Sequence, residues 1–172
     1  MRTTFHQELS EAIQAIDQEK IKRLEELVEK ARRVFIIGNG GSNALANHIE
    51  IDYIKCLDKP TVSMSNNGLT TALVNDYDTH TEYVRFLECQ RADEEDLVVL
   101  ISSSGNSRNI KLAGDYCIEW ETPFIIMTGF DKNNDVRQAF KDKAYLDLWV
   151  DSKSYGIVEL THEAMLHAIV DN

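Results

Sequence analysis

The sequence predicts one α/β domain of three layers, with helices on both faces of a doubly wound, five-stranded parallel sheet. Short apolar runs rich in β-branched residues alternate with amphipathic segments along all 172 residues. Such alternation is typical of parallel strands joined by crossover helices. Two of the apolar runs end in turns rich in glycine or serine. A composition of 43% hydrophobic and 27% charged residues fits a single domain with its own core.

Charge and cysteine content exclude several classes of protein. The formal net charge of −11 argues against a nucleic-acid partner, because phosphate backbones are held by clustered Lys and Arg. The 3 cysteines are widely spaced without a C-x-x-C pair, so we expect reduced, largely buried thiols. The N-terminus has no signal-peptide pattern, and no apolar run is long enough to cross a membrane. These features predict a cytoplasmic protein without a membrane partner.

The N-terminal segment, residues 4 to 31, predicts one long helix before the first strand. Its apolar residues are spaced mostly by three, four or five: Phe5, Leu9, Ile13, Ile16, Ile21, Leu24, Leu27 and Val28. A helix of this length could cover the sheet or pack on another subunit.

The first predicted strand, residues 34–37, runs into the turn Gly38-Asn39-Gly40-Gly41-Ser42. Glycines allow a tight backbone turn, and Ser42 is a natural N-cap for a helix over residues 43–57. The free N–H groups of that helix's first turn would point back into the glycine turn. This arrangement favours an anion, above all a phosphate.

A second strand, residues 97–101, runs into Ser102-Ser103-Ser104-Gly105-Asn106-Ser107, where hydroxyls replace glycines as phosphate partners. If the two strands are parallel neighbours, both turns open on the sheet edge where α/β folds bind ligands. Neither turn carries a G-x-G-x-x-G or P-loop pattern, so we expect no nucleotide cofactor.

The remaining elements complete the alternation of strands and helices. In order they are a strand over 61–64, a short helix over 69–74, a polar turn containing Asn75 and Asp76, a helix over about 79–90, a helix from 106 or 107 to 120, a strand over 123–127, a short helix over 136–140, a strand over 145–150 and a helix over 156–170.

Two helices carry histidines and carboxylates at helical spacing. His48 and Asp52 lie one turn apart, and Glu159, Glu163 and His167 form an i, i+4, i+8 series on the last helix. An imidazole and a carboxylate from each helix suit a zinc-like ion, and equally a general acid and base. Solvated surface pairs are the alternative interpretation of the same spacing.

Together these motifs resemble the sugar isomerase (SIS) domain family, and within it the branch that isomerises heptose phosphates. The residues that carry the resemblance are the glycine turn from Gly38 to Ser42, His48, Asn75-Asp76-Tyr77, the serine run from Ile101 to Ser107, and the histidines His162 and His167. The resemblance covers nearly the whole chain and implies one SIS domain, residues 1–172, of the flavodoxin-like type. It also implies a homotetramer with sites between subunits, so the helix of residues 1–31 is expected to contact another subunit.

The resemblance implies a role for each matching residue. The phosphate would be held by Ser102, Ser103, Ser104 and Ser107. The sugar would contact Asn39, Gly40, Gly41, Ser42, Asn75, Asp76 and Glu159. Asp52 would be the catalytic base and His167 a proton shuttle, while His48, Asp52, Glu159 and His167 would hold one Zn²⁺ per subunit. The same four groups could also work without metal.

Two residues depart from the family pattern. Asp52 stands where the heptose-phosphate isomerases carry glutamate, and Glu159 where they carry glutamine, in the run Gly156-Ile157-Val158-Glu159. With these two residues the metal site keeps its ligands or gains negative charge. The Asp52 carboxylate, however, reaches less far than that of a glutamate, because its side chain is one methylene shorter. A carboxylate bound tightly to metal is also a poorer base, so Asp52 cannot fully serve both roles.

The activity that the resemblance implies is an aldose–ketose isomerisation through a cis-enediol, with sedoheptulose 7-phosphate and D-glycero-D-manno-heptose 7-phosphate as substrate and product. Two alternatives remain open: a non-catalytic SIS protein that binds a sugar phosphate and regulates, and an isomerase of another phosphosugar. A pure binding module has no need of acid–base groups such as His48, Asp52 and His167.

Overall fold

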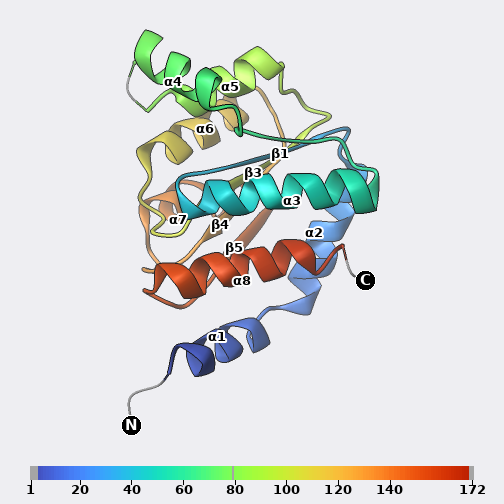
Figure 1. Cartoon of the computed structure of the whole chain (residues 1–172), viewed down its shortest axis with the longest axis vertical. Coiled ribbons are helices and arrows are strands. Elements are labelled where there is room, and N and C mark those ends of the chain that lie inside the picture. Colours follow the sequence, from blue (N-terminus) through green and yellow to red (C-terminus); the bar gives the residue numbers. More distant parts are fainter. Residues whose placement is uncertain (1–3, 79, 171–172) are drawn as a thin grey trace.

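The computed structural model describes residues 4–78 and 80–170, so the expected helix start at Thr79 lies outside the described residues. Five parallel strands form one sheet in the order β2-β1-β3-β4-β5, which confirms the predicted doubly wound fold (Figure 1). The strands are β1 (Val34–Gly38), β2 (Thr61–Ser63), β3 (Leu97–Ser102), β4 (Phe124–Thr128) and β5 (Leu146–Trp149).

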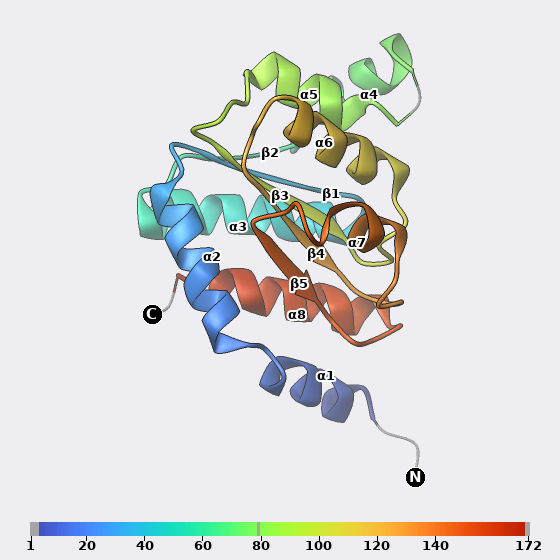
Figure 2. The same ribbon diagram turned by 180° about the vertical axis from the view of Figure 1, so that it is seen from behind.

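Helices cover both faces of the sheet (Figures 1 and 2). The first face packs against α2 (Gln18–Lys30), α3 (Gly41–Leu57) and α8 (Tyr155–His167). The second face packs against α4 (Asn67–Asp76), α5 (Glu82–Gln90), α6 (Arg108–Glu119) and α7 (Asp135–Phe140). The remaining helix, α1 (Phe5–Gln14), lies against α8.

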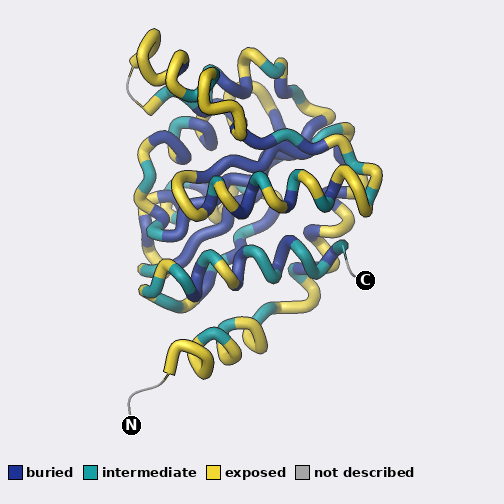
Figure 3. Tube along the Cα trace, in the orientation of Figure 1, coloured by how far each residue is buried: buried dark blue, intermediate teal, exposed yellow. Residues whose placement is uncertain are grey.

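The central strands are buried along their whole length, as the dark tube in Figure 3 shows. Successive side chains point to opposite faces. Val34 and Ile36 of β1 therefore join the core under α3 and α8, whereas Phe35 and Ile37 join the core under α5 and α6. Burial on both faces explains why these strands are continuous apolar runs.

The prediction of one helix over residues 4–31 is wrong, because the segment forms two helices. The side chain of Asp17 accepts a hydrogen bond from the backbone N–H of Glu19 (3.0 Å) and caps α2. Aspartate favours such an N-cap over a helix interior. The spacing of five from Ile16 to Ile21 marks the same break, since it is too long for one helical face. Only α2 contributes buried residues to the core.

Two smaller expectations also differ from the structure. Ser42 lies inside the first turn of α3 and is buried, because the N-cap is Gly40 in a positive-φ conformation (φ 54°). Cys56 and Cys89 are exposed and only Cys117 is buried, although all three are free thiols. No helix among the described residues has the length and apolar character needed to span a bilayer.

His162 fastens α8 to the sheet. Its ring is 0% exposed, and Nε2 donates a hydrogen bond to the backbone carbonyl of Thr128 at the end of β4 (3.1 Å). Burial lowers the pKa of His162 from its ordinary 6.5 to about 4. The folded protein therefore keeps this imidazole neutral over a range in which the unfolded chain protonates it.

We expect His162 to make stability depend on pH between about 6.5 and 4. The free energy of unfolding should fall as the pH drops through this range, by up to about 3 kcal/mol, because only the unfolded state takes up the proton. His162→Gln keeps an N–H donor but does not titrate. Urea unfolding at several pH values should show a shallower loss of stability in this variant, and equal slopes would contradict the assignment.

Candidate functional site

The two polar turns meet at the carboxyl edge of the sheet, as expected from the sequence. Strands β1 and β3 are parallel neighbours, with Gly38 opposite Ile101. The hydroxyl oxygens of Ser42 and Ser103 lie 3.3 Å apart. The glycine turn and the serine turn therefore form one continuous polar surface at this edge.

The serine turn is arranged to receive an anion. Gly105 adopts a positive φ of 71°, a conformation that suits glycine, and its N–H donates to the carbonyl of Ser102 (2.9 Å). The Ser102 hydroxyl donates to the Ser107 hydroxyl (2.9 Å), so Ser107 makes no capping bond to its own helix. Clustered hydroxyls next to the uncapped N-terminus of α6 provide several donors for a phosphate.

A partly buried amide network supports the glycine turn. The side chains of Asn39 and Asn109 exchange two hydrogen bonds, of 2.9 and 2.8 Å. Asn109 also donates to Glu82 (2.6 Å), and the Tyr83 hydroxyl donates to Asn39 (3.1 Å). Asn39 therefore ties β1 to α5 and α6. Asn109, Glu82 and Tyr83 were not among the residues predicted at the site, since nothing in their local spacing indicates this contact.

Helices α3 and α8 run side by side across the same face of the sheet (Figure 1). The Tyr53 hydroxyl donates to the backbone carbonyl of Leu166 (3.2 Å) and fixes their register. Toward the start of α3, the Glu159 carboxylate occupies the space that a Cβ of Gly41 would need. Burial raises the pKa of Glu159. Glu159 therefore borders the glycine turn.

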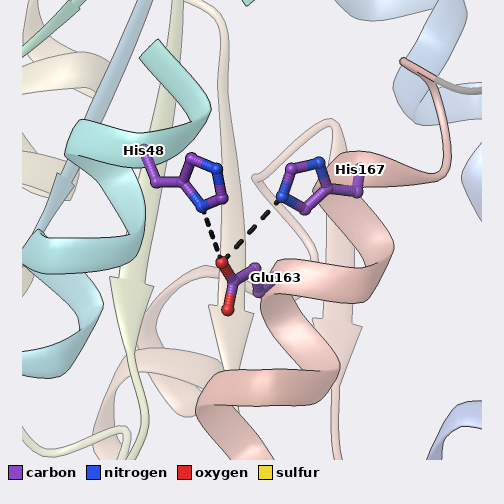
Figure 4. Close-up of side chains that lie close together, drawn as sticks. All are labelled: His48, Glu163 and His167. Carbon is purple, nitrogen blue, oxygen red and sulfur yellow. Dashed lines mark hydrogen bonds and ion pairs between the residues drawn. The ribbon is translucent and has the colours of Figure 1, made fainter. Parts of the chain in front are cut away.

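Farther along the two helices, two imidazoles and two carboxylates gather, three of them drawn in Figure 4. Glu163 Oε1 lies 2.9 Å from His48 Nδ1 and 3.9 Å from His167 Nε2. On the other side of the rings, Asp52 Oδ2 lies 3.4 Å from His48 Nε2 and 3.6 Å from His167 Nδ1. Each imidazole thus stands between two carboxylates, in a setting suited to proton exchange.

The structure brings Glu163, rather than Glu159, to the two histidines. Ligand atoms of His48, Glu163 and His167 all lie within 4.8 Å of one another. Nitrogen and carboxylate donors at such spacing fit a zinc-like cation. The i, i+4, i+8 series contained this residue, but spacing alone could not tell which turn of α8 faces His48.

Among the described residues, the side chains of Asn75 and Asp76 hydrogen-bond to each other and not to the polar turns or the two histidines. They occupy the last turn of α4, which is longer than the sequence predicted, and both are exposed. The Asn75 side chain donates to Asp76 (2.8 Å). Within one chain, α4 stands at the far end of the molecule from α8 (Figure 1).

Comparisons with known proteins agree with the fold. The sequence model of the SIS domain matches residues 3–129. Phosphoheptose isomerase of Mycobacterium tuberculosis is 33% identical over 146 residues, covering 81% of this chain and 71% of the relative. The enzyme of the same name from Geobacter sulfurreducens is 32% identical over 146 residues, covering 81% and 74%. The chain therefore belongs to the SIS domain family, in its phosphoheptose isomerase branch.

A solved structure shows the same architecture. The phosphoheptose isomerase of Neisseria gonorrhoeae superposes with a TM-score of 0.83 at 25% identity, covering 95% of this chain and 90% of the other. The family resemblance and the flavodoxin-like sheet that the sequence predicted are both confirmed.

We expect Ser102→Ala and Ser104→Ala to weaken binding of a sugar phosphate by about 1–3 kcal/mol, because each removes a hydroxyl from the surface that would receive the charged phosphate. Isothermal titration calorimetry with sedoheptulose 7-phosphate measures the effect. Ser10→Ala, on α1, is the matched control. Affinity unchanged in both turn variants would contradict a phosphate site at the serine turn.

Proposed function

We propose that this chain is an aldose–ketose isomerase that interconverts sedoheptulose 7-phosphate and D-glycero-D-manno-heptose 7-phosphate. One observation carries the proposal: the same helix, α3, begins at the glycine turn and carries His48 two turns and Asp52 three turns farther on. An anion site and an acid–base cluster are thus joined by one rigid element. The names of the relatives support the same reaction.

The spacing within α3 supports a long substrate. His48 follows Gly41 by seven residues, which corresponds to about 10 Å along a helix. An extended seven-carbon sugar phosphate can span this distance, with its phosphate on Ser102, Ser103, Ser104 and Ser107 and its carbonyl end near His48. Asn39, Gly40, Gly41, Ser42 and Glu159 would border the carbons in between.

The chemistry is a proton transfer between adjacent carbons. Asp52 takes the proton from the carbon next to the carbonyl and returns one to the neighbouring carbon of the enediol. His167 moves a proton between the two oxygens. Asp52 Oδ2 lies 3.6 Å from His167 Nδ1, so the two groups can act on adjacent atoms of one substrate.

A zinc ion, one per subunit, belongs to the proposal as well. The set that the family resemblance implies is His48, Asp52, Glu159 and His167. The nitrogen and carboxylate atoms that lie close enough to share a cation are those of His48, Glu163 and His167. When bound, it would polarise the substrate oxygens and favour the enediol.

We also propose a cytoplasmic homotetramer with sites completed by a second subunit. Exposed apolar side chains on the three helices beside the site support an interface there; they are Phe5, Ile13, Ile51, Ile54, Tyr155 and Leu160. A neighbouring copy could also bring Asn75 and Asp76 toward the substrate, which one chain alone does not do. Light scattering on the purified protein measures the assembly.

Two other functions remain candidates. A regulatory SIS protein would bind the sugar phosphate without converting it, and an isomerase of a pentose or amino-sugar phosphate would convert a shorter substrate. The two imidazoles flanked by carboxylates favour catalysis over binding alone. The distance of about 10 Å along α3 between Gly41 and His48 favours the longer substrate.

The proposal is tested by incubating the protein with a panel of ketose phosphates and following aldose formation by NMR. We expect turnover of sedoheptulose 7-phosphate and little of the five- and six-carbon ketose phosphates. Binding of sedoheptulose 7-phosphate without turnover would favour the regulatory protein. Preferred turnover of a shorter sugar would replace the proposed substrate.

Asp52→Asn should lower turnover by about 10²- to 10⁴-fold while the sugar phosphate still binds, because the amide keeps the shape of the side chain but cannot take a proton. Asp52→Glu, which gives the longer acid of the heptose-phosphate isomerases, should not raise turnover above that of the wild type, since the site is fitted to the shorter acid. Asp115→Asn, on the exposed side of α6, is the control. Turnover unaffected by Asp52→Asn would assign the base to Glu159 or His167.

A further inference from the structure

The Asn109 amide, at the start of α6, has no hydrogen-bonding capacity left for a ligand. Its Nδ2 atom donates to Asn39 Oδ1 (2.8 Å) and to Glu82 Oε1 (2.6 Å), which uses both N–H groups. Its Oδ1 atom accepts from Asn39 Nδ2 (2.9 Å) and from the backbone N–H of Ile110 (2.9 Å). Asn109 is also buried. This side chain therefore acts on its protein neighbours and not directly on a substrate.

Glu82, at the start of α5, decides which way the Asn109 amide is turned. A carboxylate only accepts hydrogen bonds, so the Asn109 atom beside Glu82 Oε1 is the nitrogen. The reversed amide would set its oxygen against this carboxylate and its N–H groups against the Ile110 N–H. The bond from Ile110 favours the same orientation, but a hydrogen bond to an ionised group is about twice as strong as a neutral one.

The orientation of Asn109 in turn fixes that of Asn39 in the glycine turn. With the Asn109 nitrogen in place, the Asn39 oxygen lies beside it and the Asn39 nitrogen meets the Asn109 oxygen. The buried Tyr83 hydroxyl shares its proton between the Gly38 carbonyl and Asn39 Oδ1. A reversed Asn39 would lose this bond and would face Asn109 with like groups.

One N–H group of Asn39 is left for a ligand. Its Nδ2 atom carries two N–H groups, and among the described residues only Asn109 accepts from it. The two N–H bonds of an amide diverge, so the second points away from Asn109, and Asn39 is an exposed residue. We propose that Glu82 is a positioning residue, which acts through Asn109 to present this N–H to an oxygen of the bound sugar phosphate.

The orientation matters because the two ends of an amide recognise different groups. An N–H binds carbonyl, phosphate and hydroxyl oxygens, whereas the amide oxygen binds only donors such as hydroxyls. A reversed or mobile Asn39 would therefore lose its contact with a carbonyl or phosphate oxygen. The inference rests on the proposed function for the identity of the ligand. It adds a residue that touches no substrate and yet sets the affinity for it.

The test compares steady-state kinetics on sedoheptulose 7-phosphate. We expect Glu82→Ala to raise KM about 10-fold and to change kcat less than about 2-fold, because Asn39 would border carbons away from the reacting end. Glu82→Leu fills similar space without an acceptor and should act alike. Glu82→Gln, whose Oε1 can still accept from Asn109, should recover most of the affinity. Glu88→Ala, at an exposed position of the same helix, is the matched control and should match the wild type.

A double-mutant cycle separates positioning from a general loss of structure. Asn39→Ala removes the N–H itself, so adding Glu82→Ala to it should not raise KM any further. A further rise of about 10-fold in the double variant would overturn the inference, because the two effects would then be independent. Wild-type KM in both Glu82→Ala and Glu82→Leu would overturn it as well.

A second readout needs no ligand. In isotope-labelled protein, NMR resolves the side-chain amide protons of Asn39, one of which is bonded to Asn109. We expect its exchange with solvent to quicken about 10-fold in Glu82→Ala and to stay unchanged in Glu88→Ala. Unchanged exchange in Glu82→Ala would overturn the inference. Faster exchange in a protein that neither binds nor converts the sugar phosphate would overturn the proposed function alone.

Discussion

The site depends on the parallel packing of α3 and α8 on one face of the sheet. Tyr53 of α3 is fully buried, and its hydroxyl donates to the carbonyl of Leu166 in α8. This bond satisfies a polar group inside an apolar core and sets the helices in one register. In that register Glu159 meets Gly41, Glu163 meets His48 and His167 meets Asp52. A shift of one turn would separate all three pairs.

The polar turns are held from the opposite face of the sheet. The amides of Asn39 and Asn109 bond each other, and Glu82 and Tyr83 of α5 join them. His162 adds a bond from α8 to the end of β4. The glycine turn is thus tied to α5 and α6, and the end of β4, which pairs with β3, is tied to α8. These bonds keep the sheet edge in place before a ligand arrives.

Much of the fold could be predicted because the strands are buried on both faces. Continuous apolar runs such as Val34 to Ile37 predict strands that are buried on both faces. The glycine or serine turns that follow two of these runs predicted which edge of the sheet is polar. The break at Asp17 was missed because apolar residues continue past it at nearly helical spacing. Spacing showed that Glu159, Glu163 and His167 share one face of a helix. It could not show which of them meets His48, since the register between two helices is set by distant contacts such as Tyr53 with Leu166.

The central claim is that one substrate bridges the serine turn and the paired imidazoles. A crystal structure of the Asp52→Asn variant grown with sedoheptulose 7-phosphate tests this most directly. We expect the phosphate against Ser102, Ser103, Ser104 and Ser107, with the first two carbons between the new amide side chain on α3 and His167. A phosphate bound away from the serine turn, or a sugar chain directed away from α8, would contradict the claim.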